Sequence, residues 1–228
     1  MKTKVGLLII ATNKYIDFAI NLIHSADKHF LVDEDVEYFL FTDHSDLKID
    51  SQRKINIIKI NHSPWPWMTL GRYKIFNDHK ALLQYQDYLF YCDADMRFSD
   101  SVGNEILSDR VATQHPGYYG ARGTPETNPK SLACVFPFEY MQYFAGGFNV
   151  GSSSEYLKMA ERLSGNIQHD YNNGIIAVWH DESHINRYFL DNPPTKILDP
   201  GYCYGESLKP PFTPRLIALD KNHKELRS

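Results

Sequence analysis

The sequence lacks any apolar run long enough to cross a membrane as a helix. A spanning helix needs about 20 consecutive apolar residues, and the run near the N-terminus extends only from Val5 to Ala11. Lys2 and Lys4 before this run imitate the start of a signal peptide, but no small-x-small cleavage site follows. We therefore expect a soluble protein without a membrane span, in which this run is the first buried strand.

Cysteine is scarce, and neither sign of charge predominates. The three cysteines, Cys92, Cys134 and Cys203, are an odd number without close spacing. This pattern is typical of a reducing compartment rather than of a disulfide scaffold, and it predicts a cytoplasmic location. The formal net charge of −4 argues against general nucleic-acid binding. The chain also has no internal repeat, and 228 residues are enough for a single domain with one core.

In the first half of the chain, short apolar runs alternate with helical patterns. Between Tyr15 and Phe30 the spacing of three and four residues predicts a helix whose buried face carries Phe18, Leu22, Ile23, Ala26 and Phe30. The segments 36–43 and 55–60 are typical of strands, and the segment 70–85 is typical of a helix. This alternation predicts an α/β fold with helices on a mostly parallel central sheet.

The second half is less regular. The segment 114–131 is rich in Gly, Pro, Thr and Asn, which predicts a long surface loop. A glycine-bearing strand then precedes a helix, where Ser152 and Glu155 have the spacing of a capping box. A further short helix must end before Pro193. The last ten residues carry little apolar content, so we expect a loose tail.

Two aspartates follow the apolar run 87–92 directly. If the strand continues, Asp93 and Asp95 project from the same face at its carboxyl end, where α/β sheets bind ligands. At about 4 Å and an effective dielectric near 20, such a pair repels by roughly 4 kcal/mol, which a shared proton or a cation would relieve.

Three interpretations of this Asp-x-Asp pair are open. The aspartates can cap an exposed loop, act as the nucleophile and acid of a haloacid dehalogenase-type phosphatase, or hold a divalent cation against a nucleotide diphosphate. Arg97 occupies the position where the phosphatase motif has threonine. The metal site is therefore favoured.

The segment WHDESH, residues 179–184, concentrates further polar groups. His180 and His184 have the i, i+4 spacing of a zinc helix, but Glu182 lies about 200° around the helix from His180 and cannot be the base of that motif. A helix N-terminus capped by Asp181 is a second interpretation. A sugar site is a third, in which Trp179 stacks on the ring and the carboxylates accept bonds from hydroxyls.

Together these stretches resemble glycosyltransferase family 6, the retaining galactosyl- and N-acetylgalactosaminyltransferases that include the ABO blood-group enzymes. The segments that carry the resemblance, in the order of the family, are KYIDFAINLIHSADKHF, VEYFLFTD, DYLFYCDADMRF, VGNEIL, HPGYYG, GIIAVWHDESHINRYFL and DKNHKELR. The resemblance implies a GT-A fold, Rossmann-like, with a nucleotide-binding half of about residues 1–95, an acceptor-binding half of about 96–213 and a flexible tail of about 214–228.

The resemblance also implies roles for individual residues. Asp93 and Asp95 would hold Mn²⁺ against the diphosphate of the donor, UDP-GalNAc or UDP-Gal, and Glu182 matches the catalytic glutamate. Other residues implied at the donor are Ile10, Thr12, Tyr15, Arg72, Ala145, Gly146, Gly147, His180, Asp181, Lys221 and Arg227. Residues implied at the acceptor are His115, Trp179 and Glu206.

The reaction implied is transfer of GalNAc or Gal, with retention of configuration, to the 3-hydroxyl of a β-galactoside. The acceptor would be a galactoside or a fucosylated oligosaccharide. The small residues at Ala145 to Gly147 leave room for an N-acetyl group, so we expect UDP-GalNAc as the preferred donor. A metal-dependent sugar-nucleotide hydrolase and a carbohydrate-binding module without catalysis are the alternatives.

Overall fold

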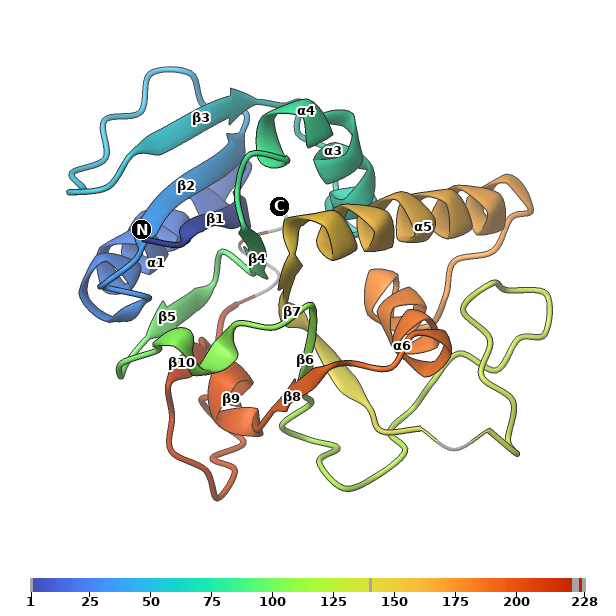
Figure 1. Cartoon of the computed structure of the whole chain (residues 1–228). Helices are drawn as coiled ribbons and strands as arrows, with labels where there is room; N and C mark the ends of the chain where they lie inside the picture. The colour runs from blue at the N-terminus through green and yellow to red at the C-terminus, as the bar shows by residue number, and fades with distance from the viewer. Residues whose placement is uncertain (1, 140, 223–225, 227–228) are drawn as a thin grey trace.

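The computed structural model describes all residues except 1, 140, 223–225 and 227–228. Within the described residues, seven strands form a central sheet in the order β3-β2-β1-β4-β7-β6-β8 (Figure 1). These strands are β1 (Lys4–Ile10), β2 (Asp35–Thr42), β3 (Ile55–Lys59), β4 (Tyr88–Cys92), β6 (Arg110–Gln114), β7 (Phe144–Ser152) and β8 (Lys196–Leu198). Only β7 runs antiparallel to its neighbours. The expected mostly parallel sheet is confirmed.

Helices cover both faces of this sheet. On one face lies α1 (Ile16–His29), and on the other lie α3 (Arg72–Asp78), α5 (Ser153–Asn172) and α6 (Asp181–Asp191) (Figure 1). The remaining helical segments are short: α2 (Trp67–Leu70), α4 (Lys80–Leu83) and the 3-10 turns η1 (Asn13–Tyr15), η2 (Asn104–Ile106) and η3 (Pro200–Cys203). The α/β class with helices flanking the sheet is confirmed.

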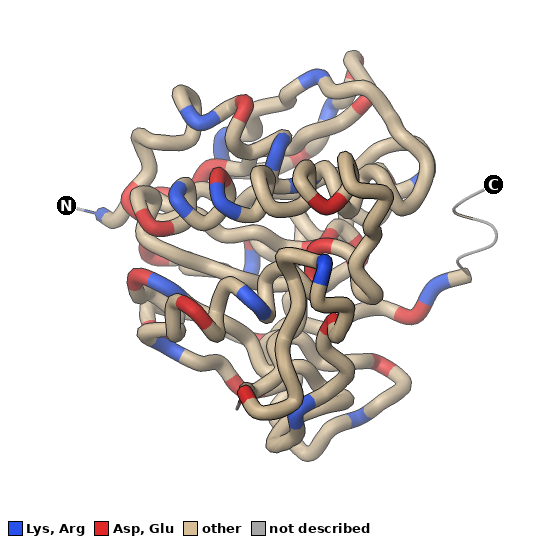
Figure 2. The backbone as a smooth tube through the Cα atoms, turned by 90° about the vertical axis from the view of Figure 1, so that its right-hand side faces the viewer, with Lys and Arg blue, Asp and Glu red and all other residues tan. Residues whose placement is uncertain are grey.

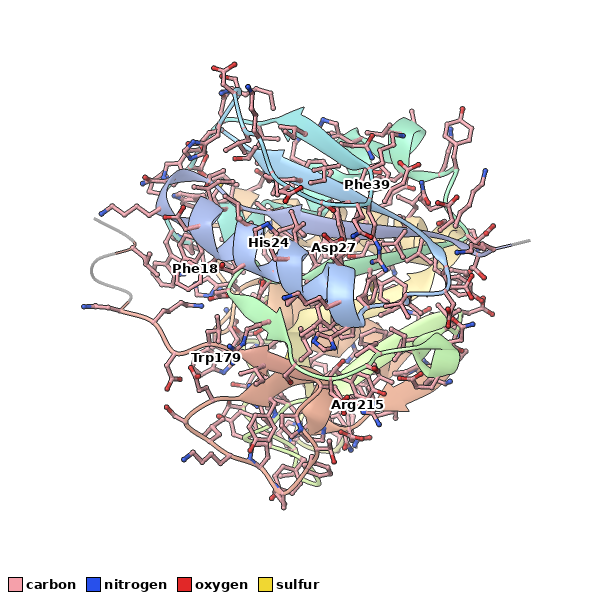
Figure 3. All side chains as sticks on the ribbon, turned by 90° about the vertical axis from the view of Figure 1, so that its left-hand side faces the viewer. Phe18, His24, Asp27, Phe39, Trp179 and Arg215 are labelled. Atoms are coloured by element: carbon pink, nitrogen blue, oxygen red, sulfur yellow. The ribbon has the colours of Figure 1, made fainter. Side chains whose placement is uncertain are left out.

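The central sheet separates the hydrophobic core into two layers, and β1 contributes side chains to both. Leu7 and Ile9 belong to the cluster under α1, while Leu8 between them belongs to the cluster under α3 and α5. Because β1 is buried on both faces, its sequence is an almost continuous apolar run. Figure 3 views the molecule from the side of α1; Phe18 on this helix is only half-buried and packs against Tyr15, so it does not join the core as expected.

A small second sheet joins distant parts of the chain. It consists of β5 (Met96–Phe98), β10 (Leu216–Ala218) and β9 (Tyr204–Gly205). β10 pairs antiparallel with β5, directly after the two aspartates. β10 falls inside the segment expected to be a flexible tail, so these three residues are instead part of a sheet.

Two local predictions were wrong. The helix expected over 70–85 is broken at Gly71 and His79 into α2, α3 and α4. Ser152 and Glu155 form no capping box, because the carboxylate of Glu155 binds Arg110 at 2.9 Å and Lys158 at 2.7 Å instead. Two cations are stronger partners for a carboxylate than a backbone N–H.

The described surface carries no dominant charge of one sign. Basic and acidic residues are interspersed in Figure 2. Among the described residues, no helix is long and apolar enough to cross a membrane. The expected long loop after β6 is confirmed, since its described residues between 115 and 143 contain neither a helix nor a strand.

Candidate active site

A cavity of about 320 Å³ opens at the carboxyl ends of β1 and β4. Parallel strands that end side by side leave such a crevice, which is the usual ligand position in α/β sheets. Seven of the expected donor residues line it: Ile10, Thr12, Tyr15, Arg72, Asp93, Asp95 and Lys221. Arg227 lies outside the described residues.

Asp93 and Asp95 lie in a turn rather than in a strand. β4 ends at Cys92, and the N–H of Met96 donates to the carbonyl of Asp93 at 3.2 Å. The argument from strand alternation was therefore wrong. The turn nevertheless brings both carboxylates to the wall of the cavity.

Arg72 is a buried cation that joins three segments. Its side chain is only 7% exposed, and its two terminal nitrogens contact Asp93 Oδ1 at 3.1 Å and Asp181 Oδ2 at 3.0 Å. Nη1 also donates to the carbonyl of Gly146 at 3.1 Å, and the guanidinium lies 4.0 Å from the ring centre of Tyr91. Burial alone would lower the pKa of Arg72, but Asp181 and its other anionic neighbours raise it well above its usual value. Arg72 therefore stays charged.

Asp93 and Asp95 each have a cation of their own. Arg72 pairs with Asp93, and Lys221, from the segment after β10, pairs with Asp95. Nζ of Lys221 also lies 5.9 Å from the ring centre of Tyr15, which lines the same cavity. The repulsion expected between the two carboxylates is thus offset by protein cations in this structure.

Glu182 is held by two donors. The hydroxyl of Tyr143 donates to Oε1 at 2.9 Å, and the N–H of Gly146 donates to Oε2 at 2.8 Å. Burial raises the pKa of Glu182 to about 7, although both hydrogen bonds favour the charged form and act to lower it. A carboxyl with such a pKa can change protonation state near neutral pH.

Asp181 is not the cap of α6, as one interpretation of the sequence proposed. His180 is the N-cap, with φ 54° and ψ −125°, and Asp181 begins the helix. The carboxylate of Asp181 turns to Arg72 instead, because a buried cation is the stronger partner. Burial raises the pKa of Asp181 to about 6 despite the pull of Arg72. The His180 ring packs edge-on against Trp65, which lines the cavity.

His115 and Trp179, two of the residues expected at the acceptor, lie at the long loop after β6. His115 packs on Tyr118 and Tyr143, and burial lowers its pKa to about 4, so its imidazole is neutral at pH 7. Trp179 donates its indole N–H to Thr124 in the same loop at 2.7 Å. Two of the three expected acceptor residues therefore lie around this loop.

Glu206 is not joined to them by any contact described in the structure. It is exposed, and its carboxylate accepts a bond from the backbone N–H of Asp220 at 3.0 Å. Its segment does approach the loop, since Leu208 reaches Gly117 and Phe212 packs on Tyr119.

The glycines at the start of β7 allow carboxylates to approach the backbone. A Cβ at Gly147 would lie 2.9 Å from Oδ2 of Asp93, and a Cβ at Gly146 would lie 3.2 Å from Cβ of Glu182. Both distances are shorter than ordinary van der Waals contacts. Ala145, by contrast, is buried in the core under α1.

The donor set around the cavity fits a hard divalent cation. Acidic groups exceed basic groups by two among the described residues in and next to it: Asp93, Asp95, Asp181 and Glu182 against Arg72 and Lys221. Carboxylate oxygens are preferred ligands of such cations. The described residues contain no group of three or more His, Cys, Asp or Glu arranged to hold a metal, so a cation here would need other ligands besides Asp93 and Asp95.

The zinc interpretation finds no support in these contacts. The ring of His180 packs on Trp65, whereas His184 faces Asp170 of α5.

Sequence reasoning missed several residues of the site. Tyr91 donates to Asp93, and Tyr143 donates to Glu182, yet each occurs in an apolar run that looked purely structural. His62 and Trp65 line the cavity from the segment HSPWPW. This run of aromatic and proline residues outside any periodic pattern was the one available signal.

Comparisons with known proteins agree with this geometry. The family model described as glycosyltransferase family 6 matches residues 1–228. Histo-blood group ABO system transferase 1 of Rattus norvegicus is 37% identical over 99% of this chain and 69% of its own length. Globoside alpha-1,3-N-acetylgalactosaminyltransferase 1 of Homo sapiens is 32% identical over 98% of this chain and 68% of its own length. Human alpha-1,3-galactosyltransferase 2 is 24% identical over 98% and 70%.

Proposed function

The chain belongs to glycosyltransferase family 6 and is a hexosyltransferase, and we propose that it transfers GalNAc or Gal from UDP to the 3-hydroxyl of a β-galactoside, with Mn²⁺ and with retention. The acceptor is a galactoside or a fucosylated oligosaccharide. The observation that carries this proposal is the convergence of Asp93, Asp95 and Lys221 on one cavity, beside Glu182.

Binding of the nucleotide uses the end of β1. Ile10, Thr12 and Tyr15 line the cavity there and would contact the uridine. Asp93 and Asp95 would hold Mn²⁺, which when bound neutralises the diphosphate and stabilises the UDP leaving group. Lys221 and Arg227 would supply further positive charge to the phosphate oxygens.

The chemical step would depend on the charge of Glu182. Retention requires either two inversions through a covalent glycosyl-enzyme or a same-face reaction in which the leaving diphosphate helps to deprotonate the acceptor. Glu182 would be the nucleophile in the first route and would stabilise the positively charged sugar in the second. The bonds from Tyr143 and Gly146 support both, because they fix the carboxylate in one position.

The remaining assignments complete the proposal. His180 and Asp181 would contact the donor sugar, and His115, Trp179 and Glu206 the acceptor. Gly146 and Gly147, with Ala145 before them, leave space that suits GalNAc. We assign residues 1–95 to nucleotide binding and 96–213 to acceptor binding within one domain, and the segment that follows β10 would close over UDP. The three cysteines, which are free and buried, support a cytoplasmic location.

The test is an assay of UDP release with Mn²⁺, with and without a galactoside acceptor. Release that the acceptor stimulates supports the transferase. Release that is independent of acceptor would instead favour a sugar-nucleotide hydrolase, and no release from any UDP-sugar would favour a carbohydrate-binding module. A panel of glycans with UDP-GalNAc and UDP-Gal then identifies the acceptor and the donor.

A further inference from the structure

Tyr91 is a core residue that contacts both members of an ion pair in the candidate active site. It lies in β4, between β1 and β7 in the sheet (Figure 1), and is only 2% exposed. Its ring packs in the core under α3 and α5, with its centre 5.7 Å from that of Phe76. At the same time its hydroxyl donates to Oδ1 of Asp93, and the guanidinium of Arg72 lies 4.0 Å from its ring centre. The proposed transfer reaction assigns no role to this tyrosine.

The two carboxylate oxygens of Asp93 have different surroundings. A carboxylate oxygen has two lone pairs, and those of Oδ1 are taken by the hydroxyl of Tyr91 and by Nη2 of Arg72 at 3.1 Å. No described residue donates a hydrogen bond to Oδ2, and Oδ2 is not among the buried polar atoms without a partner, so it keeps accessible surface. Asp93 lines the donor cavity, and 37% of its side chain is exposed. Oδ2 is therefore the oxygen that Asp93 offers to a ligand.

Both donors to Oδ1 are held in place by the surrounding structure. Burial raises the pKa of Tyr91 well above its usual value, so its phenol keeps the proton that it donates. Arg72 is fixed by Asp181 at 3.0 Å and by the carbonyl of Gly146 at 3.1 Å. Rotation of the Asp93 carboxylate would break hydrogen bonds to both donors, which is costly for buried partners.

This arrangement limits the way in which Asp93 can bind a cation. Ca²⁺ takes about six to eight oxygen ligands and often both oxygens of one carboxylate, whereas Mg²⁺ requires a compact octahedral site. Mn²⁺ is likewise bound in octahedral sites of oxygen ligands. We propose that Tyr91 is a positioning residue that restricts Asp93 to coordination through Oδ2 and thereby selects Mn²⁺ or Mg²⁺ against Ca²⁺. The selection rests on the proposed metal-dependent function, whereas the fixed position of the carboxylate does not.

A second buried tyrosine provides a matched control. Tyr91→Phe removes only the hydroxyl and keeps the ring beside Arg72. Tyr156 is 1% exposed and also packs on Phe76, with ring centres 6.3 Å apart, but its hydroxyl has no hydrogen-bond partner among the described residues. Tyr156→Phe therefore removes the same atom from the same part of the core without breaking a described hydrogen bond.

The selection is tested by the affinities for two cations. Mn²⁺ binding is followed by EPR at one fixed concentration of UDP, and Ca²⁺ binding by the displacement of bound Mn²⁺. The ratio of the Kd of Ca²⁺ to the Kd of Mn²⁺ should fall by about threefold or more in Tyr91→Phe, because Oδ1 becomes available as a second ligand. The ratio should stay at the wild-type value in Tyr156→Phe. A site that is merely loosened would bind both cations more weakly, so an unchanged ratio in Tyr91→Phe would overturn the selection.

The position of Asp93 is tested without any metal. Unfolding by urea in EDTA is measured for Tyr91→Phe, Asp93→Ala and the double variant. If the hydroxyl holds the carboxylate, the unfolding constant of the double variant should differ by about fivefold or more from the value expected when the two single effects are combined. The same cycle with Tyr156→Phe should show no such difference. Independent effects of Tyr91→Phe and Asp93→Ala would overturn the positioning role.

The two tests separate this proposal from the proposed function. If wild type binds neither cation, the metal-dependent function fails and the selection fails with it, while the unfolding measurements still decide whether Tyr91 positions Asp93. The cation titrations need only Tyr91→Phe and Tyr156→Phe, so they remain decisive if Asp93→Ala does not fold.

Discussion

The hydroxyl of Tyr143 donates a hydrogen bond of 2.9 Å to Oε1 of Glu182. The backbone of Gly146 donates to the other carboxylate oxygen, so neither oxygen is free to rotate away. Burial nevertheless has the larger influence and raises the pKa of Glu182 to about 7. The charge of this carboxyl is therefore sensitive to small changes around it.

Replacement of the carboxylate should stop the chemistry and spare nucleotide binding. Glu182→Gln keeps the shape but removes the charge that both retaining routes require. We expect kcat to fall by roughly 10² or more, about 2.7 kcal/mol. The Kd of UDP, measured by calorimetry, should stay close to that of wild type. Glu161→Gln, on the exposed face of α5, is the control, and a near-normal kcat in Glu182→Gln would refute the assignment.

The pH dependence of kcat should follow the protonation of Glu182. If anionic Glu182 reacts, kcat rises with pH through about 7 and then levels off. Tyr143→Phe removes a donor that favours the charged form, so the pKa of Glu182 increases and the rise moves to higher pH. The measurement is kcat from pH 5 to 9. Tyr85→Phe, at an exposed tyrosine, should not move the profile, and a move to lower pH in Tyr143→Phe would contradict the argument.

The free energy of unfolding should depend on pH in the opposite direction, falling as pH rises. Because the folded pKa of Glu182 is raised, its favourable contribution is complete below the unfolded pKa, near 4.5, and is lost as pH rises through about 7. Glu182→Gln should therefore have a higher Tm than wild type at pH 8 and a smaller advantage at pH 5. If the Tm advantage of Glu182→Gln over wild type grew toward acid pH, the folded protein would instead stabilise the charged carboxylate.

The paired aspartates should be required for metal-dependent binding. Asp93→Asn and Asp95→Asn each replace a carboxylate by a neutral amide, which is a poorer ligand for a hard cation. We expect most activity to be lost and the Kd of UDP with Mn²⁺ to rise at least tenfold, about 1.4 kcal/mol. Asp33→Asn, at an exposed position, is the control. Full activity of wild type in EDTA would contradict a metal-dependent reaction.

A methyl group at Gly147 should affect both the donor and the metal. Because its Cβ would lie 2.9 Å from Oδ2 of Asp93, Gly147→Ala should shift kcat/KM toward UDP-Gal and also raise the Mn²⁺ concentration that gives half-maximal activity. The shift between donors should be about tenfold to a hundredfold. Gly165→Ala, with open space around its Cβ, is the control. Wild type that uses UDP-Gal at least as well as UDP-GalNAc would refute the expected preference.

Loss of the cation at Lys221 should be measurable without substrate. The side chain of Asp95 is 8% exposed and pairs with Lys221, so Lys221→Met leaves a poorly compensated carboxylate. We expect a loss of about 1–3 kcal/mol in the free energy of unfolding. Added Mn²⁺ should increase the free energy of unfolding of this variant by more than it increases that of wild type. The kcat of the variant should be lower than that of wild type. An equal effect of Mn²⁺ on both proteins would argue against metal binding at Asp95.

Local patterns predicted the elements, and long-range contacts decided the details of the site. β1 follows from its continuous apolar run, because it is buried on both faces, and α1 follows from its apolar spacing, because that spacing is buried except at Phe18. The capping box predicted for α5 does not form, because Glu155 binds Arg110, which is 45 residues away in the sequence. The partners of Arg72 and Glu182 are likewise distant in sequence, so no local pattern identifies them. The position of Asp93 after a buried strand was enough to locate the cavity, although not its geometry.

The reversed direction of β7 has a consequence for how this enzyme can diversify. Parallel strands place only their last residues at the edge of the sheet where ligands bind, whereas β7 places its first residues there. The carbonyl of Gly147 therefore accepts a hydrogen bond from the N–H of Asp93. The residues that would select the donor thus lie in the first half of the strand. We expect substitutions there to change the donor preference while the rest of β7 keeps its pairing with β4, so new donor preferences could evolve by single steps.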